Sequence, residues 1–136
     1  MRERSRAREW ALRVLYAWET RGGDLTAVLE EFMFRRRIGA ERRPYIRRLV
    51  EALAADTAGV DSAVQEALTN WRMERLSAID RNILRLAATE MLHFEDIPPR
   101  VSIQEALRLA EKYGTDQSPR FVNGVLDALM RRLDRA

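Results

Sequence analysis

Apolar residues recur every three or four positions along almost the whole chain, and this feature constrains the fold more than any other. Such spacing places apolar side chains on one face of an α-helix, whereas a half-buried strand needs strict alternation, which no useful length of the sequence has. We therefore predict an all-α bundle of about seven helices joined by short loops. The apolar stripes cover residues 7–18, 25–32, 45–53, 60–71, 103–113 and 122–133, and one more helix runs from Ser77 to about Phe94.

Capping residues predict where several helices begin and end. Ser77 with Asp80 three residues later resembles a capping box in which Asp replaces the longer Glu, and Ser102 with Glu105 forms a full capping box. Gly59 marks the predicted end of the third helix. The helix that begins at Ser77 is apolar on much more than one narrow stripe. It should therefore be the central and most buried helix.

The residue types that are missing limit the chemistry of the chain. It has 136 residues, a length that favours one domain, with no cysteine and a single histidine, His93. This excludes disulfides, thiolate zinc sites, iron–sulfur clusters and multi-histidine metal sites. A Gly-rich phosphate loop, a GxSxG elbow and an HExxH motif are also missing. We expect a protein without catalytic activity, cofactor or metal.

The distribution of apolar residues also bears on location. No apolar run is long enough to cross a membrane. The basic start, MRERSRARE, is not followed by the apolar segment and small residues of a secretory signal. We therefore expect a cytoplasmic protein that does not associate with membranes.

The basic charge is concentrated in the first part of the chain. Residues 1–50 hold 13 arginines and 7 acidic residues, a net charge of +6, whereas residues 51–136 hold 11 basic and 14 acidic residues, a net charge of -3. Of the 24 basic residues 23 are arginine, whose planar guanidinium suits phosphate and base recognition. A codon-usage bias toward arginine explains the same count equally well.

The first predicted helix combines arginines with an outward-facing aromatic ring. At 100° per residue, Arg2, Arg6, Glu9, Arg13 and Tyr16 lie opposite the apolar stripe. Proteins that bind single-stranded RNA use guanidinium groups for phosphates and rings for base stacking. The alternative is a solvated charged face on which Tyr16 covers a neighbouring helix. We also expect residues 1–8 to form a partly flexible basic arm that becomes ordered on RNA.

The start of the last helix is a second candidate surface. Phe121 lies at the edge of the apolar stripe and is at most half covered, and Gly124 faces outward, where it costs about 1 kcal/mol relative to Ala. Free N–H groups at the helix start, with Arg120 beside them, suit a phosphate. Close approach of a ligand would account for Gly124. Alternatively, a loop covers Phe121 and another helix crosses at Gly124.

Four blocks of this sequence resemble the NusB family of bacterial transcription antitermination factors, in order and over nearly the whole chain. They are ARE at 7–9 with LYA at 15–17, RLSAIDRNILRLA at 75–87, DIP at 96–98 with VSIQEA at 101–106 and AEKYG at 110–114, and SPRFVNGVLD at 118–127. The FVNGVLD run is the most specific of them.

The resemblance implies a fold of two packed three-helix subdomains. It also implies binding of single-stranded boxA-type RNA together with the ribosomal protein NusE, within an RNA polymerase antitermination complex that acts on ribosomal RNA operons. Asp80 corresponds to an acidic position linked to partner binding. The family's RNA-binding positions correspond to Arg4, Ser5, Arg6, Arg8, Tyr16 and Phe121.

The sequence departs from the family at two positions and leaves two rival functions open. Ser5 stands where some members have arginine, and Gln104 replaces the usual Asn of the INEA motif. One rival is a protein-interaction module that forms a homodimer, since some members self-associate. The other is an accessory domain of an rRNA-modifying enzyme, because a related domain is fused to rRNA cytosine methyltransferases.

Overall fold

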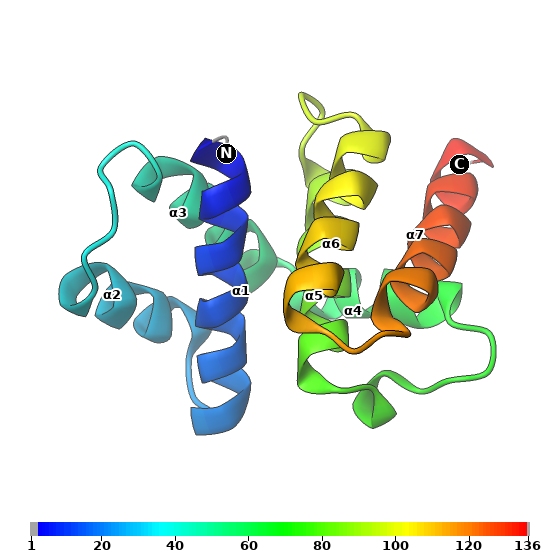
Figure 1. Ribbon diagram of the computed structural model, residues 1–136, viewed down its shortest axis with the longest axis horizontal. Coiled ribbons are helices and arrows are strands. Elements are labelled where there is room, and N and C mark those ends of the chain that lie inside the picture. The colour runs from blue at the N-terminus through cyan, green and yellow to red at the C-terminus, as the bar shows by residue number, and fades with distance from the viewer. Residues whose placement is uncertain (1–2, 136) are drawn as a thin grey trace.

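The computed structural model describes residues 3–135 and confirms the predicted all-α fold (Figure 1). The described residues contain no strand. They form α1 (Glu3–Arg21), α2 (Leu25–Arg35), α3 (Arg43–Ala55), α4 (Thr57–Ala67), the 3-10 turn η1 (Met73–Arg75), α5 (Ala78–His93), α6 (Pro99–Tyr113) and α7 (Ser118–Arg135).

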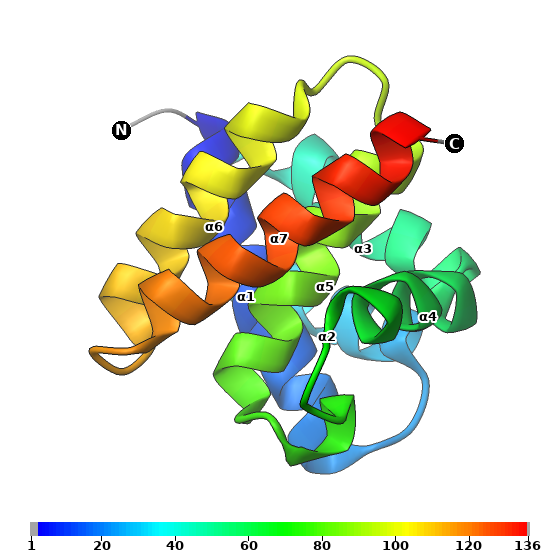
Figure 2. The ribbon, with the colours of Figure 1, turned by 90° about the vertical axis from the view of Figure 1, so that its right-hand side faces the viewer.

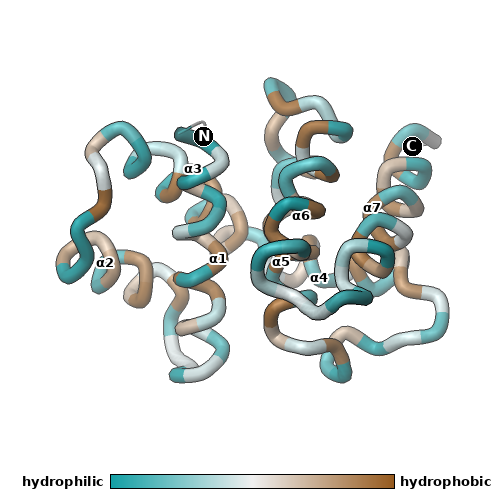
Figure 3. Tube along the Cα trace, in the orientation of Figure 1, coloured by the Kyte–Doolittle hydropathy of each residue, from teal (hydrophilic) through white to brown (hydrophobic). Residues whose placement is uncertain are grey.

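The helices divide into the two expected groups. Helices α1, α2 and α3 pack against one another, and α5, α6 and α7 form the second group (Figures 1 and 2). Helix α4 packs against α5 and α7, and α1 and α3 join the groups by packing against α5. Apolar and polar stretches alternate along the helices, which is the pattern of amphipathic helices around a shared core (Figure 3).

Helix α5 is the central helix, as its sequence predicts. Every residue from Asn82 to Glu90 is buried, including charged and polar side chains. A helix that neighbours surround on all sides has to satisfy such polar groups internally. The polar residues of α5 are therefore where the two groups of helices are joined.

Two predicted helix boundaries are wrong. Gly59 lies inside α4, because the chain turns earlier, at Asp56, whose carboxylate accepts the Gly59 backbone N–H at 3.2 Å. Helix α6 begins at Pro99, so Ser102 lies within the helix and is buried rather than capping it. The Ser77 cap is confirmed, since its Oγ accepts the backbone N–H of Asp80 at 3.1 Å.

The structure also differs from the basic arm expected at residues 1–8. Residues 3–8 form the first turns of α1, and Arg2 lies outside the described residues. Within residues 3–135, none of the helices is both long and apolar enough to span a bilayer.

Candidate nucleic-acid interface

Two of the N-terminal arginines, Arg4 and Arg6, project from the exposed side of α1. The Arg4 guanidinium lies 4.7 Å from the centre of the Tyr45 ring and 3.7 Å from the carboxylate of Asp96. Arg6 forms no ion pair with any side chain in the described part of the molecule. Both guanidinium groups are accessible to an external phosphate. Arg6 can bind a phosphate without breaking an existing ion pair among the described residues.

The third N-terminal arginine, Arg8, is buried in a polar cluster around Glu90. Arg8 Nε donates to Glu90 Oε2 at 2.7 Å, and the hydroxyl of Tyr45 donates to the same oxygen at 2.6 Å. Ser102 Oγ donates to Glu90 Oε1 at 2.7 Å, and Glu105 lies 3.4 Å from Arg8 Nη1. The cluster therefore joins α1, α3, α5 and α6 at one buried carboxylate.

The charges in this cluster support one another. Burial opposes the charge of Arg8, but the hydrogen bond to Glu90 and its negative charge outweigh that cost and raise the pKa of Arg8. Burial, together with the Glu90 charge, raises the pKa of the Tyr45 hydroxyl and keeps it a neutral donor. Removing one partner from such a buried pair leaves an uncompensated charge.

Ser5, a second position predicted to bind RNA, is buried like Arg8. It is 6% exposed, and its backbone carbonyl accepts Arg108 Nη2 at 2.8 Å. Arg8 is 5% exposed. In the structure both residues fasten α1 to the second group of helices, and RNA contact by Ser5 and Arg8 stays a prediction.

Tyr16 borders an open depression between α1, α2 and the ends of α5 and α6. Its side chain is 47% exposed, as predicted from the helix spacing, and the depression has a volume of about 360 Å³. Arg13 and Arg36 also line it, with their guanidinium groups 5.0 Å from the Trp10 ring and 4.9 Å from the Phe32 ring. Neither arginine forms an ion pair within the described residues. The depression thus combines an exposed ring with two available cations.

Glu9, predicted to share the outer face of α1, is instead turned toward α6. Its carboxylate accepts hydrogen bonds from Arg108 at 2.6 Å, Tyr113 at 2.8 Å and Lys112 at 2.9 Å. Partial burial opposes its negative charge, but these donors outweigh that cost and lower the pKa of Glu9 to about 2. The one acidic residue of the predicted face is therefore fully engaged, and the exposed part that remains is basic and aromatic.

Phe121 lines a second depression, of about 250 Å³, at the start of α7. The residue is more than half buried and packs against the core, so it is more covered than the sequence predicts. Asp80, Arg75 and Trp71 lie around the same depression. Buried Ser118 supports its floor, because its Oγ accepts the backbone N–H of Thr115 at 3.0 Å. Phe121 and Asp80, which are 41 positions apart in the sequence, are thus brought into one site.

Trp71 is a candidate that the sequence pattern misplaced in the core. Helix α4 ends at Ala67, so Trp71 falls in the following loop and is 56% exposed. Gln65 Nε2 donates to the Trp71 carbonyl at 3.0 Å, and Gln65 Oε1 accepts the Met73 N–H at 3.0 Å. This clamp holds the loop in place. The sequence offers a signal for the earlier helix end, because polar Thr69 and Asn70 directly precede Trp71.

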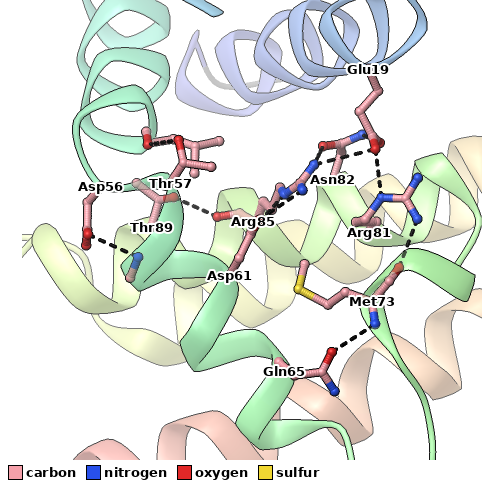
Figure 4. A network of polar contacts seen from close by, with 12 residues as sticks. Glu19, Asp56, Thr57, Asp61, Gln65, Met73, Arg81, Asn82, Arg85 and Thr89 are labelled. Carbon is pink, nitrogen blue, oxygen red and sulfur yellow. Dashed lines mark hydrogen bonds and ion pairs between the residues drawn. The ribbon is translucent and has the colours of Figure 1, made fainter. Parts of the chain in front are cut away.

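A polar network ties the loop that carries Trp71 to its surroundings (Figure 4). Arg81 Nε donates to Glu19 of α1 at 2.8 Å, and its Nη1 donates to the Met73 carbonyl at 2.9 Å. Arg85 binds both carboxylate oxygens of Asp61 on α4, at 2.8 and 3.0 Å. The start of α5 is therefore fixed relative to α1 and α4 before any ligand arrives.

Asp80 caps its own helix only partly. Its backbone N–H is bound by Ser77, but its Oδ1 is buried without a hydrogen-bond partner among the described residues. A capping box normally uses Glu or Gln, whose longer side chain reaches back to the N-cap N–H. Asp is one methylene shorter, so the second half of the box is not formed.

The outer face of α7 beyond Phe121 is open. Arg120 is exposed and has no acidic partner in the structure from residue 3 to 135. Gly124 is exposed, and a Cβ added there would meet no atom within 4 Å. The alternative in which a neighbouring helix crosses at Gly124 is therefore wrong for the described chain.

The two depressions adjoin at one end of the bundle. Ile79 lines the Tyr16 depression and the next residue, Asp80, lines the Phe121 depression. Tyr113 lines the first and Thr115, two residues later, lines the second. The α-helical rise places Arg6 about 15 Å from Tyr16 along α1. The structure thus places Phe121 and Asp80 in one depression and Tyr16 in the adjoining one. Arg4 and Arg6 belong to the first turns of α1, whose N-terminus lies at the opposite end of the bundle (Figure 1).

Comparison with known proteins agrees with this arrangement. The model of the NusB family matches residues 5–131. The transcription antitermination protein NusB of Sorangium cellulosum is 42% identical over 99% of this chain and 96% of its own length. The protein of the same name from Desulfosudis oleivorans is 36% identical over 98% of this chain and 88% of its own length.

Solved structures give the same relationship. NusB of T. maritima superposes with a TM-score of 0.84 at 35% identity, covering 94% of this chain and 90% of that protein. A NusB chain from a complex of the antitermination factors NusB and NusE with dsRNA superposes with a TM-score of 0.85 at 28% identity, covering 97% of this chain and 98% of that one. Matching motifs, fold and family model establish that this chain belongs to the NusB family.

Proposed function

We propose that this protein is a non-catalytic transcription antitermination factor. It binds single-stranded boxA-type RNA together with the ribosomal protein NusE and supports transcription of ribosomal RNA operons by RNA polymerase. The observation that carries the proposal is the pair of adjoining depressions, each lined by an accessible aromatic ring, Tyr16 in one and Phe121 in the other. The family relationship and the NusE-bound relative support it.

Arginines supply the electrostatic part of RNA binding. Arg4 and Arg6 on α1 and Arg120 on α7 are accessible and neutralise phosphates on either side of the aromatic end. Three such contacts on single-stranded RNA predict a log-log salt slope of about -2. Bases stack on Tyr16 and Phe121, and each stacked ring contributes about 1–3 kcal/mol.

Ser5, Arg8 and Asp80 have supporting roles in this proposal. Ser5 and Arg8 orient the start of α1 through Arg108 and Glu90, so that Arg4 and Arg6 project outward. Asp80 contacts the NusE partner from the rim of the Phe121 depression. RNA and partner then share one continuous surface.

A binding titration tests the proposal. A labelled boxA-type RNA and a scrambled RNA of equal length are titrated with the chain at two salt concentrations, with and without NusE. We expect NusE to tighten binding of the boxA-type RNA and not that of the scrambled RNA. Equal, weak and strongly salt-dependent binding of both RNAs would contradict it and favour a protein-interaction module. Light scattering of the same samples detects a homodimer that RNA does not alter.

A further inference from the structure

A short segment at the end of α2 exposes an aromatic ring beside three arginines. Phe34 is 89% exposed, the highest value among the exposed large apolar residues of the described chain. Arg35, Arg36 and Arg37 follow it directly, and all three are exposed. None of them forms an ion pair with the residues that the structure describes. Of this segment, Phe34–Arg37, only Arg36 also lines the Tyr16 depression described above.

The neighbouring acidic residues are already engaged with other arginines. Glu30 pairs with Arg47, and Glu31 pairs with Arg21. Arg35 and Arg36 are close enough to help lower the pKa of Glu31, but they form no direct contact with it. The segment therefore presents three cations whose charges are not neutralised locally, which is the arrangement expected of an anion-binding surface.

The segment is held in place rather than loosely attached. Arg43 Nη1 donates to the Met33 carbonyl at 2.9 Å, and Arg43 Nε donates to the Ile38 carbonyl at 3.1 Å. These bonds fasten the chain immediately before and after Phe34–Arg37 to the start of α3. A fixed position lowers the ordering cost of binding a ligand there.

The segment continues from the Tyr16 depression. Arg36 belongs to both, because its guanidinium lies over the Phe32 ring and lines the depression beside Tyr16 and Arg13. A strand of RNA with a base on Tyr16 therefore meets Arg36 next and the rest of the segment after it. Arg13 and Arg36 have no acidic partner within residues 3–135, so the basic surface is continuous.

We propose that Phe34–Arg37 is a second RNA contact, which binds nucleotides flanking the boxA-type element. Arg35 and Arg37 neutralise phosphates and Phe34 stacks one unpaired base. The inference rests on the proposed function and extends it. Single-stranded RNA offers phosphates and base faces together, which suits a ring set among arginines, whereas a second copy of this chain would bring the same positive segment to a symmetric contact.

The test compares RNAs of two lengths in the presence of NusE. One is the boxA-type RNA alone, and the others carry about six additional unpaired nucleotides of alternating adenosine and cytidine at the 5′ or the 3′ end. The variants are Phe34→Ala and the double variant Arg35→Gln/Arg37→Gln. Arg100→Gln/Arg132→Gln, on α6 and α7, is the matched control because it removes the same charge from a distant surface.

We expect one of the extended RNAs to bind the unaltered chain more tightly than the boxA-type RNA alone. Phe34→Ala should remove about fivefold of that gain, as loss of a stacked base predicts. Arg35→Gln/Arg37→Gln should remove most of the gain and reduce the salt slope by about 1.4. Both variants should bind the unextended RNA as the unaltered chain does, and the control should retain the gain.

Other outcomes separate the two proposals. If boxA-type RNA is preferred over scrambled RNA but extension adds nothing, the second contact is overturned and the proposed function stands. If both variants bind extended RNA as tightly as the unaltered chain does, the second RNA contact is also overturned. This holds even if the variants bind an acidic protein more weakly, because the segment would then be a protein-binding surface. If no RNA is preferred over its scrambled form, the proposed function itself fails.

Discussion

Two regions of this protein use arginine beside aromatic rings for opposite purposes. At the junction around Glu90, Arg8 and Tyr45 are buried and share one carboxylate. At the end of the bundle around Tyr16 and Phe121, the Tyr16 ring is accessible, and Arg13, Arg36 and Arg120 lack acidic partners within the described residues. Residue type alone therefore does not assign a binding role to an arginine beside an aromatic ring. An arginine is available to a ligand only where no buried carboxylate already pairs with it.

The largest effect should come from breaking the buried junction. Arg8→Ala leaves Glu90 charged and buried with one donor fewer, so we expect a loss of about 3–5 kcal/mol in the free energy of unfolding. Urea denaturation followed by circular dichroism measures it. Arg6→Ala, two residues away and exposed, is the control and should change stability by less than about 0.5 kcal/mol. Equal stability of the two variants would mean that Arg8 does not carry this junction.

The second largest effect should come from acid, which weakens the contact that Glu9 makes between α1 and α6. The pKa of Glu9 is about 2 in the folded protein, below its ordinary value of 4.5, so its contribution to stability is complete above about pH 5. That contribution is lost as the pH falls toward 2, because the folded state must then take up the proton. We expect Glu9→Gln to be less stable than the unaltered chain at pH 7, with the difference shrinking on acidification. A difference independent of pH would contradict the charge-based account.

Removing a ring from the open end should weaken RNA binding. Phe121→Ala and Tyr16→Ala should each weaken binding of boxA-type RNA by about 1–3 kcal/mol, and the thermal melt of Tyr16→Ala should be nearly unchanged because Tyr16 is 47% exposed. Phe121→Leu is the matched control for packing, because it keeps an apolar side chain but removes the flat ring. If Phe121→Leu binds RNA normally, stacking is not the contribution of Phe121.

Trp71 also borders the Phe121 depression, although it comes from the loop after α4. We expect Trp71→Ala to weaken RNA binding in the presence of NusE by about 1 kcal/mol. At 56% exposure its removal should leave the melting temperature almost unchanged. Binding measured by fluorescence anisotropy tests this, with Trp10→Phe as a control elsewhere on the chain. If Trp71→Ala lowers the melting temperature and leaves RNA affinity normal, Trp71 has a structural role and does not bind RNA.

The smallest effect belongs to a single exposed cation. Arg6→Gln should lower the magnitude of the log-log salt slope of RNA binding by about 0.7, the value for one phosphate contact on a single strand. Affinity measured at three or more salt concentrations gives this slope. Arg131→Gln, on the distant part of α7, should leave the slope unchanged. A slope that does not respond to Arg6 would place the RNA phosphates elsewhere.

Helical spacing was sufficient to predict much of the fold and part of the site. It predicts the all-α class, the central position of α5 and the exposure of Tyr16, because these depend on the angle of a residue around its own helix. It underestimates how far Phe121 is covered, because packing against other parts of the chain decides that. It failed at Ser102, read as a cap, because the helix starts earlier at Pro99. It also failed at Trp71, where the apolar stripe continues past the end of α4.

Local backbone geometry sets which side chains each helix presents inward and outward, so this much follows from the amino-acid sequence. Which outward charges remain available depends on pairing with residues distant along the chain, and therefore on the tertiary fold. Arg8 meets Glu90 across 82 positions, and Glu9 meets Tyr113 across 104. Arg35 and Arg37 have no such partner among residues 3–135. The buried, paired charges stabilise the fold. The accessible arginines keep a positive potential at the surface, and this potential attracts the phosphates of an RNA strand.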